Sequence, residues 1–223
     1  MNQKTISNSN FAGFALWQWL MIIFYGTLVG VNESFIGGMA IPYRSIIVNV
    51  ISISLLSLAR FHLPKSGSSF LIIVIAILYK LNNLGFHSCT ANVLLCNPLA
   101  LAILGISYEM LSFTIYTFVS TKSKVYLPLT TAASALLSFT LFGITNTFIL
   151  GAWEMPKLIN YIFFKGFITA VLTSVIVLLG FSISSSLQTI DNTPKLWPGK
   201  QYAFFIVSIL IVNLWIIGSL ITF

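Results

Sequence analysis

Three charged side chains lie inside or at the edge of long apolar runs, namely Lys80, Glu109 and Lys165. A charge within a membrane span costs about 2.5–3.5 kcal/mol on an insertion scale, so it usually faces a protein interior or a water-filled cavity. There it can bind a charged group of a substrate or pair with another buried charge. These residues are therefore the first candidates for chemistry.

Glu109 is the most informative of the three because it lies near the middle of the run LALAILGISYEMLSFTIYTF. No other acid falls inside a predicted span. One interpretation is that its carboxylate binds a cationic group of a substrate, or pairs with a lysine that lines a cavity. The other is that it forms an ion pair that only ties helices together. The sequence leaves both open.

Lys80 closes its apolar run and is followed by Asn82 and Asn83. These three side chains could line a pocket open to the outside. Alternatively, the lysine stem reaches along apolar surface and places its ammonium group at the membrane interface. Lys165 allows a similar interfacial placement. Asn146 lies toward the same side of the membrane and is a further candidate for a polar pocket.

The composition indicates the elements that must position these residues. Of the 223 residues, 57% are hydrophobic and only 7% are charged, whereas soluble domains carry about 25% charged residues. The chain is therefore predicted to be an integral membrane protein. We expect a single all-α domain over residues 1–223, a polytopic transmembrane helical bundle of six to seven spans with no soluble catalytic domain.

The apolar runs place the predicted spans. They cover about 11–30, 41–59, 69–84, 98–120, 127–151, 158–182 and 202–223. The first is read as a span and not as a cleaved signal. The third is short enough to be a re-entrant segment instead.

The basic residues predict the orientation of the bundle. Seven of the 11 fall in segments that share one side if the N-terminus is cytoplasmic, namely Lys4, Arg60, Lys65, Lys122, Lys124, Lys195 and Lys200. Basic residues accumulate in cytoplasmic loops. The net charge of +7 is thus explained by membrane topology and does not indicate nucleic acid.

Catalytic and metal-binding patterns are scarce. His87, Cys89 and Cys96 form only a weak metal pattern, and the cysteines are either free thiols or joined across a turn. There is no HExxH, GxSxG or phosphate-binding glycine loop. We therefore expect no cofactor, no metal and no enzymatic activity. A small-xxx-small pair, Gly26 and Gly30, permits close approach of another helix.

A set of residues over about 60–115 resembles a known family. A membrane helix ending in Arg is followed by Pro, a basic residue, Gly and Ser, then by a helix closing in Lys and another with a central Glu. Here these are Arg60, Pro64, Lys65, Gly67, Ser68, Lys80 and Glu109. The pattern is similar to that of the membrane-embedded substrate-binding (S) components of energy-coupling factor transporters.

The resemblance implies a small helical bundle that captures a vitamin or related micronutrient near its outer face. A coupling membrane protein and two ATPase subunits would drive uptake. Such components dock the coupling protein through an alanine-rich first helix, for which the glycine pair is a candidate substitute.

The leading hypothesis is therefore a substrate-capture subunit of a micronutrient importer. It would lie in the lipid of a prokaryotic inner membrane, and its substrate-binding residues would be Glu109, Lys80, Asn82, Asn83, Asn146 and Lys165. The alternative is a structural or assembly membrane protein whose buried charges pair helices. A third hypothesis is a lipid-modifying enzyme that uses His87 or Glu109 as an acid–base group.

Overall fold

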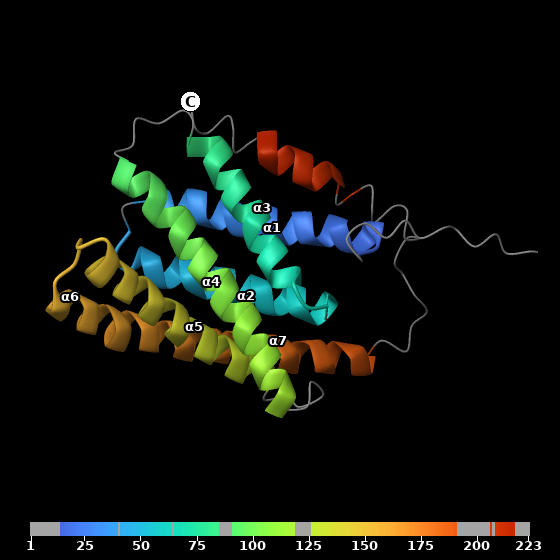
Figure 1. The fold of residues 1–223 in the computed structure, drawn as a ribbon. Coiled ribbons are helices and arrows are strands. Elements are labelled where there is room, and N and C mark those ends of the chain that lie inside the picture. Colours follow the sequence, from blue (N-terminus) through green and yellow to red (C-terminus); the bar gives the residue numbers. More distant parts are fainter. Residues whose placement is uncertain are drawn as a thin grey trace, which may run out of the picture.

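A computed structural model describes residues 14–39, 41–63, 65–84, 91–118, 126–190, 206 and 208–216. Throughout these residues the chain is essentially helical, as expected. The elements are α1 (Leu16–Gly38), α2 (Arg44–His62), α3 (Ser68–Leu84), α4 (Ala91–Phe118), α5 (Tyr126–Ile144), η1 (Thr145–Ile149), α6 (Met155–Asn160), η2 (Tyr161–Gly166) and α7 (Phe167–Ile190). Residues 208–216 are also helical. The π-helical segment η2 joins α6 and α7 into one long rod (Figure 1).

Four stretches are long and apolar enough to cross a membrane: Leu16–Gly37, Pro98–Ile115, Tyr126–Ile149 and Met155–Gly180. The stretch Ser68–Asn82 of α3 is apolar but shorter. Large apolar side chains are exposed on the outer surfaces of these helices, among them Phe113, Ile149, Phe163, Phe167 and Leu179. Such surfaces suit acyl chains.

Each of the seven apolar runs overlaps a helix, but two boundaries differ from those expected. The first helix continues past Gly30 to Gly38, and the fourth begins at Ala91 and includes Pro98 in its interior. Glycine and proline were expected to end or begin these helices. As a result Glu33 lies within a helix, and Glu109 lies in the second half of α4.

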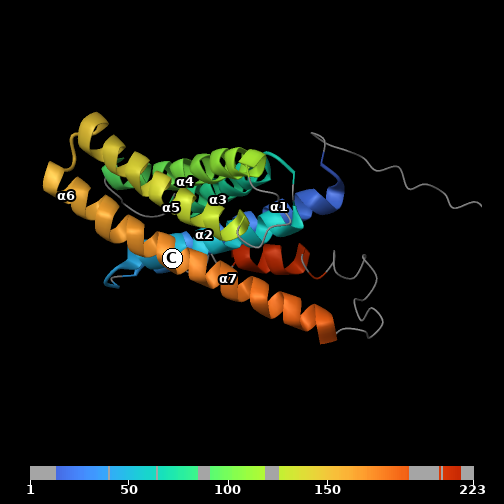
Figure 2. The same cartoon turned by 90° about the horizontal axis from the view of Figure 1, so that it is seen from below.

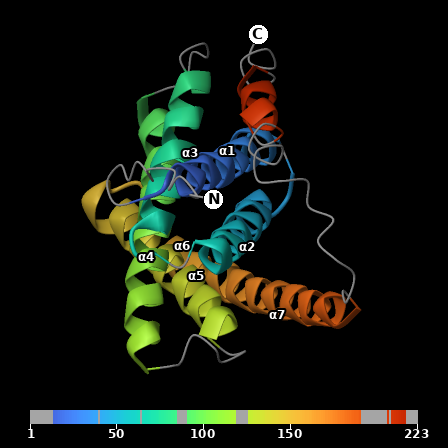
Figure 3. The ribbon, with the colours of Figure 1, turned by 90° about the vertical axis from the view of Figure 1, so that its right-hand side faces the viewer.

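The helices close into a ring. Around it each helix packs against the next in the order α1, α3, α4, α5, α7, α2 and back to α1. In Figures 2 and 3, α3 and α4 lie on one side of α1 and α2, and α7 lies on the other. The interior is filled by fully buried side chains from α1 to α4, including Ile22, Val29, Ile53, Leu56, Ile72, Ile73, Leu104 and Tyr108.

The glycine pair lets α1 and α3 pack closely. A Cβ atom on Gly26 would lie 2.6 Å from the Cβ of Ile75 and 2.7 Å from the carbonyl oxygen of Ile72. A Cβ on Gly30 would lie 2.8 Å from the ring of Tyr79. The contacts advance together along both helices, so α1 and α3 run in the same direction. The glycine face is therefore covered by α3 and is not free to dock another protein.

The helical residues 208–216 pack against α1 and α3. The indole Nε1 of Trp215 donates a hydrogen bond to Oγ1 of Thr27 at 3.0 Å. The hydroxyl of Tyr79 donates to the carbonyl oxygen of Leu214 at 3.1 Å. The last apolar run thus belongs to the same bundle.

The ring has two ends, named here by the charged residues of the α2–α3 region. At the Arg60 end, α1 begins, α2 ends and α3 begins. At the Lys80 end, α1 and α3 end and α2 begins. The turn that joins η1 to α6 also lies at the Lys80 end, because the ring of Tyr43, which precedes α2, contacts that of Phe164 in η2.

Candidate functional site

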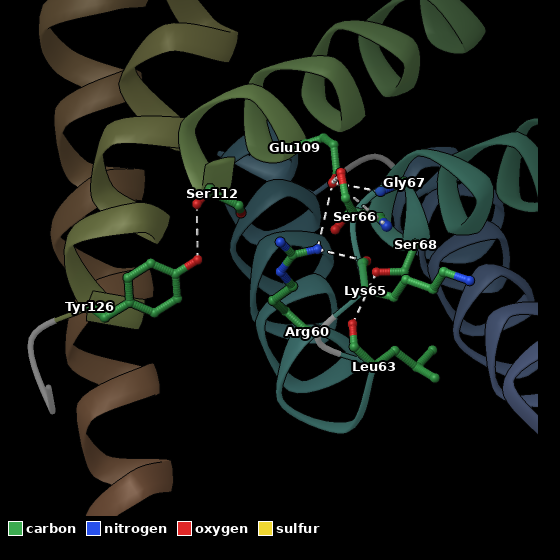
Figure 4. Close-up of polar contacts among 10 residues, drawn as sticks. Arg60, Leu63, Lys65, Ser66, Gly67, Ser68, Glu109, Ser112 and Tyr126 are labelled. Carbon is green, nitrogen blue, oxygen red and sulfur yellow. Dashed lines mark hydrogen bonds and ion pairs between the residues drawn. The ribbon is translucent and has the colours of Figure 1, made fainter. Parts of the chain in front are cut away.

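The first charged site lies at the Arg60 end, where Glu109 of α4 meets the start of α3 (Figure 4). Its Oε1 accepts a hydrogen bond from the backbone N–H of Gly67 at 2.7 Å, and its Oε2 accepts one from the N–H of Ser69 at 3.2 Å. Weaker contacts come from Ser66 Oγ at 3.4 Å and Arg60 Nη1 at 3.5 Å. The carboxylate therefore caps α3 from a neighbouring helix.

Elementary helix chemistry explains this arrangement. The first backbone N–H groups of a helix lack partners within it, and the helix dipole favours a negative charge there. Gly67 has a φ of +84°, a left-handed conformation that favours glycine, and this turn aims its N–H at the carboxylate. Arg60 Nη1 also donates to the carbonyl oxygen of Lys65 at 2.8 Å, which holds the α2–α3 turn closed.

These contacts bear on the two interpretations of Glu109. Its carboxylate pairs with Arg60, and four protein groups surround it. Few acceptor positions remain for a ligand, because a carboxylate offers about four. The geometry favours the interpretation in which Glu109 ties helices together.

The second charged site lies at the Lys80 end. The ammonium Nζ of Lys80 on α3 lies 2.7 Å from Oε1 of Glu33 on α1. The side chains are only 6% and 14% exposed, so the ammonium is held inside the protein. Lys80 and Glu109 lie at opposite ends of α3 and do not share a site.

Unlike Glu109, the Glu33–Lys80 pair keeps unused hydrogen-bonding capacity. Within the described residues, Glu33 accepts a side-chain hydrogen bond only from Lys80, although a carboxylate can accept about four and an ammonium can donate three. On the neighbouring positions of α1, Oδ1 of Asn32 and Oγ of Ser34 are also buried without a protein partner among the described residues, but Asn32 faces Val48 and Ser52 of α2 and not the ion pair. Polar groups left in this state are normally completed by water or a ligand.

Arg44 lies beside this pair at the start of α2. Its Nη1 donates to the carbonyl oxygen of Gly37 at 3.2 Å. A Cβ atom added to Gly37 would lie 3.4 Å from Oε1 of Glu33. The carboxylate of Glu33 and the guanidinium of Arg44 therefore flank the same residue. Arg44 also lies within electrostatic range of Lys80. Unlike the pair, its side chain is exposed.

An aromatic cluster lines the neighbouring helices and is called here the Tyr161 cluster. The ring of Tyr161 lies 4.7–6.0 Å, centroid to centroid, from those of Trp153, Phe139 and Phe142. Tyr161 is also within electrostatic range of Glu33. A ring contact of 6.3 Å between Tyr43 and Phe164 joins the α1–α2 turn to η2.

The Tyr161 cluster lies where the helices depart from α geometry. Tyr161 itself begins η2, and η1 follows α5 on the facing helix. π-helical turns are uncommon and frequently occur at functional sites. Two such turns lie on adjacent antiparallel helices at this end of the ring. They change the directions of the side chains there relative to those of a regular α-helix.

The other predicted site residues are distributed around this end. The ammonium of Lys165 lies 5.6 Å from the ring centroid of Tyr161, so this half-buried lysine joins the cluster. Asn146 is 2% exposed and donates from Nδ2 to the carbonyl oxygen of Phe142 at 2.9 Å, which stabilises η1. It is therefore a positioning residue.

Asn82 does not form a pocket with Lys80. Asn82 is exposed, whereas Lys80 is buried, because side chains two residues apart in a helix point in different directions. The side chain of Asn83 lies outside the described residues, as do His87, Cys89 and the side chain of Cys96. The described residues contain no group of three metal-ligating side chains.

Sequence reasoning missed Glu33 and Arg44 as members of a site. Glu33 was placed in a loop because Gly30 was taken as the end of the helix. The small-xxx-small pattern was a usable signal, because a glycine that packs helix against helix lies inside its helix. Nothing in the sequence indicated the π-helical segments that carry Tyr161.

Comparisons with known proteins add no family to this description. No protein-family model, curated protein or solved structure matches the chain. Function must therefore be inferred from the chain's own residues.

Proposed function

We propose that this protein is the substrate-capture subunit of a micronutrient importer, similar to the S components of energy-coupling factor transporters. All six helices of the ring cross a prokaryotic inner membrane, and the helix of residues 208–216 lies beside them as a seventh. The N-terminus is cytoplasmic. The Lys80 end faces outward and receives a small molecule.

One observation carries the proposal. Glu33 and Lys80 form a buried ion pair whose hydrogen-bonding capacity is largely unused. Burying two charges is expensive, and a buried pair is often no more stable than apolar residues of the same volume. A pair kept at this cost suits a site that is completed by a polar ligand.

The surroundings of the pair fit the same purpose. Arg44 adds a second cation, and the Tyr161 cluster supplies flat aromatic faces within electrostatic range of Glu33. Small-molecule sites commonly combine apolar and aromatic walls with a few fixed polar groups. Lys165 extends the polar groups along the cluster.

Coupling to partner subunits is the second part of the proposal. The chain contains no phosphate-binding glycine loop, so ATPase subunits and a coupling membrane protein would supply energy. Because Gly26 and Gly30 are covered by α3, the coupling protein must dock on another face of the ring, in contact with membrane lipid.

The proposal is tested by extracting small molecules from the chain after purification from native membranes. The denatured protein should release one small molecule in near-stoichiometric amount, and a helical membrane protein purified in parallel should not. If wild-type protein releases nothing and no small molecule stabilises it, the capture function is wrong. Co-purification of an ATPase pair checks the second part independently.

A second candidate function is a purely structural membrane protein, and the surroundings of Glu109 favour it. Glu109 connects α4 to Arg60 of α2 and to the first turn of α3. Its short hydrogen bonds are all made to groups of the protein itself. If the Glu33–Lys80 pair has the same role, neutralising it should change stability alone. No ligand should then be found.

A further inference from the structure

The charges of the Lys80 end are not balanced. Around Glu33 lie two cations, Lys80 at 2.7 Å and Arg44 across Gly37. One carboxylate faces two positive groups, and the further charges on the Tyr161 cluster, Lys157 over Trp153 and Lys165 over Tyr161, are also positive. The other described acid at this end, Glu154, is exposed at the start of α6.

The unused donors have a consistent chemistry. Among the described residues, Lys80 donates one hydrogen bond, to Glu33, which leaves two of its three N–H donors. Arg44 uses Nη1 for Gly37 and retains the rest of a planar fork that matches a carboxylate or phosphate. The spare donors are thus cationic, and they come from two helices on either side of Glu33.

We infer that the ligand of the Lys80 end is a small organic anion whose carboxylate or phosphate binds between Arg44 and Lys80. This inference rests on the proposed function and specifies its substrate class. The ligand's negative charge balances Arg44, the cation that the Glu33–Lys80 pair leaves without a counter-charge. Glu33 keeps Lys80 in place when the site is empty. The aromatic faces of Tyr161 and Trp153 lie beside the rest of the ligand.

The test measures thermal unfolding of the full chain in nanodiscs of phosphatidylcholine. A small-molecule extract of the native cells is separated by ion exchange into anionic, neutral and cationic fractions, and each is added to the protein. The anionic fraction alone should raise the unfolding midpoint, by about 5 °C at a saturating concentration. In Arg44→Gln, the concentration of the anionic fraction that gives half of the maximal rise in the unfolding midpoint should increase at least tenfold.

Lys65→Gln is the matched control because Lys65 is a cation at the opposite, Arg60 end, where its ammonium lies 4.2 Å from the ring centroid of Phe14. This variant should respond like wild type. Because Arg44 is exposed, its replacement should leave the protein folded, and an unshifted midpoint without extract verifies this. A second arm replaces the extract with phosphatidylglycerol and so distinguishes a lipid headgroup from a soluble anion.

Each outcome separates the inference from the function on which it rests. Stabilisation by the neutral or cationic fraction would overturn the anion and leave capture intact. An equal response of Arg44→Gln and wild type would also overturn it. Stabilisation by phosphatidylglycerol alone would support the anion site and overturn capture of a solute. No stabilisation by any addition would overturn both.

Discussion

Lys80 of α3 and Glu33 of α1 form an ion pair of 2.7 Å between two helices that run in the same direction. The close packing of Gly26 and Gly30 against α3 brings these helices near enough for the pair to form. Glu109 occupies the opposite end of α3 and caps its first turn. The two ends of one short helix are thus held by carboxylates from different helices.

Removing one member of the buried pair should destabilise the protein strongly. In Lys80→Met, Glu33 is left buried without its partner, which costs about 3–5 kcal/mol. For a chain of this size the midpoint of thermal unfolding in detergent should decrease by about 10 °C. Differential scanning fluorimetry of the purified protein measures it.

The double variant Glu33→Gln with Lys80→Met is the control for that measurement. It removes both charges, so it should recover most of the stability lost in the single variant. Additive losses in the double variant would show that the two side chains do not interact.

Neutralising Glu109 should affect stability and not ligand binding. In Glu109→Gln the side chain keeps its size but loses the ion pair with Arg60 and its charge at the start of α3. We expect a loss of about 1–3 kcal/mol, measured by thermal unfolding. Glu154→Gln is the control, since this exposed residue makes no capping hydrogen bond and should change little. An unchanged midpoint in Glu109→Gln would refute the capping role.

A methyl group at Gly26 should separate α1 from α3. In Gly26→Ala the new Cβ meets the backbone oxygen of Ile72 and the Cβ of Ile75, neither of which can rotate away. Overpacking of this kind costs about 1–3 kcal/mol, read as a lower midpoint of thermal unfolding. Gly180→Ala has no atom within 4 Å of its Cβ, so it should be neutral or stabilising by up to about 1 kcal/mol. Equal effects of the two substitutions would mean that close packing is not required.

The two ends of the ring should lie on opposite sides of the membrane. Ser66 at the Arg60 end and Lys157 at the Lys80 end are both exposed, and each can be replaced by cysteine in a chain without Cys89 and Cys96. A membrane-impermeant maleimide should label the cysteine at 157 in intact cells. The cysteine at 66 should react only after permeabilisation. Labelling of both in intact cells would exclude this topology.

The sequence predicts the helices well because apolar composition and length alone define them. Every expected run overlaps a helix. Lys80 and Glu109 can be singled out as charges that lie among apolar residues from the sequence alone. Their partners could not be predicted. Whether Glu109 meets Arg60 or Lys80 depends on how α3 and α4 align, which hydrophobic pattern does not specify.

Two errors have a common physical cause. Gly30 and Pro98 were treated as helix boundaries, as in water, yet both lie within helices. In a membrane protein, packing against neighbouring helices compensates for the local cost of these residues. Glu33 therefore went unnoticed as a buried acid.

Native mass spectrometry of two neutralised variants, compared with wild type, tests the division of roles between the ends of α3. The variants are Glu109→Gln and the double replacement Glu33→Gln with Lys80→Met, both required to be monodisperse. We expect the small-molecule adduct of the wild-type chain to persist in Glu109→Gln and to disappear in the double variant. An adduct that survives in the double variant and is lost in Glu109→Gln would contradict the assignment of the site to the Lys80 end.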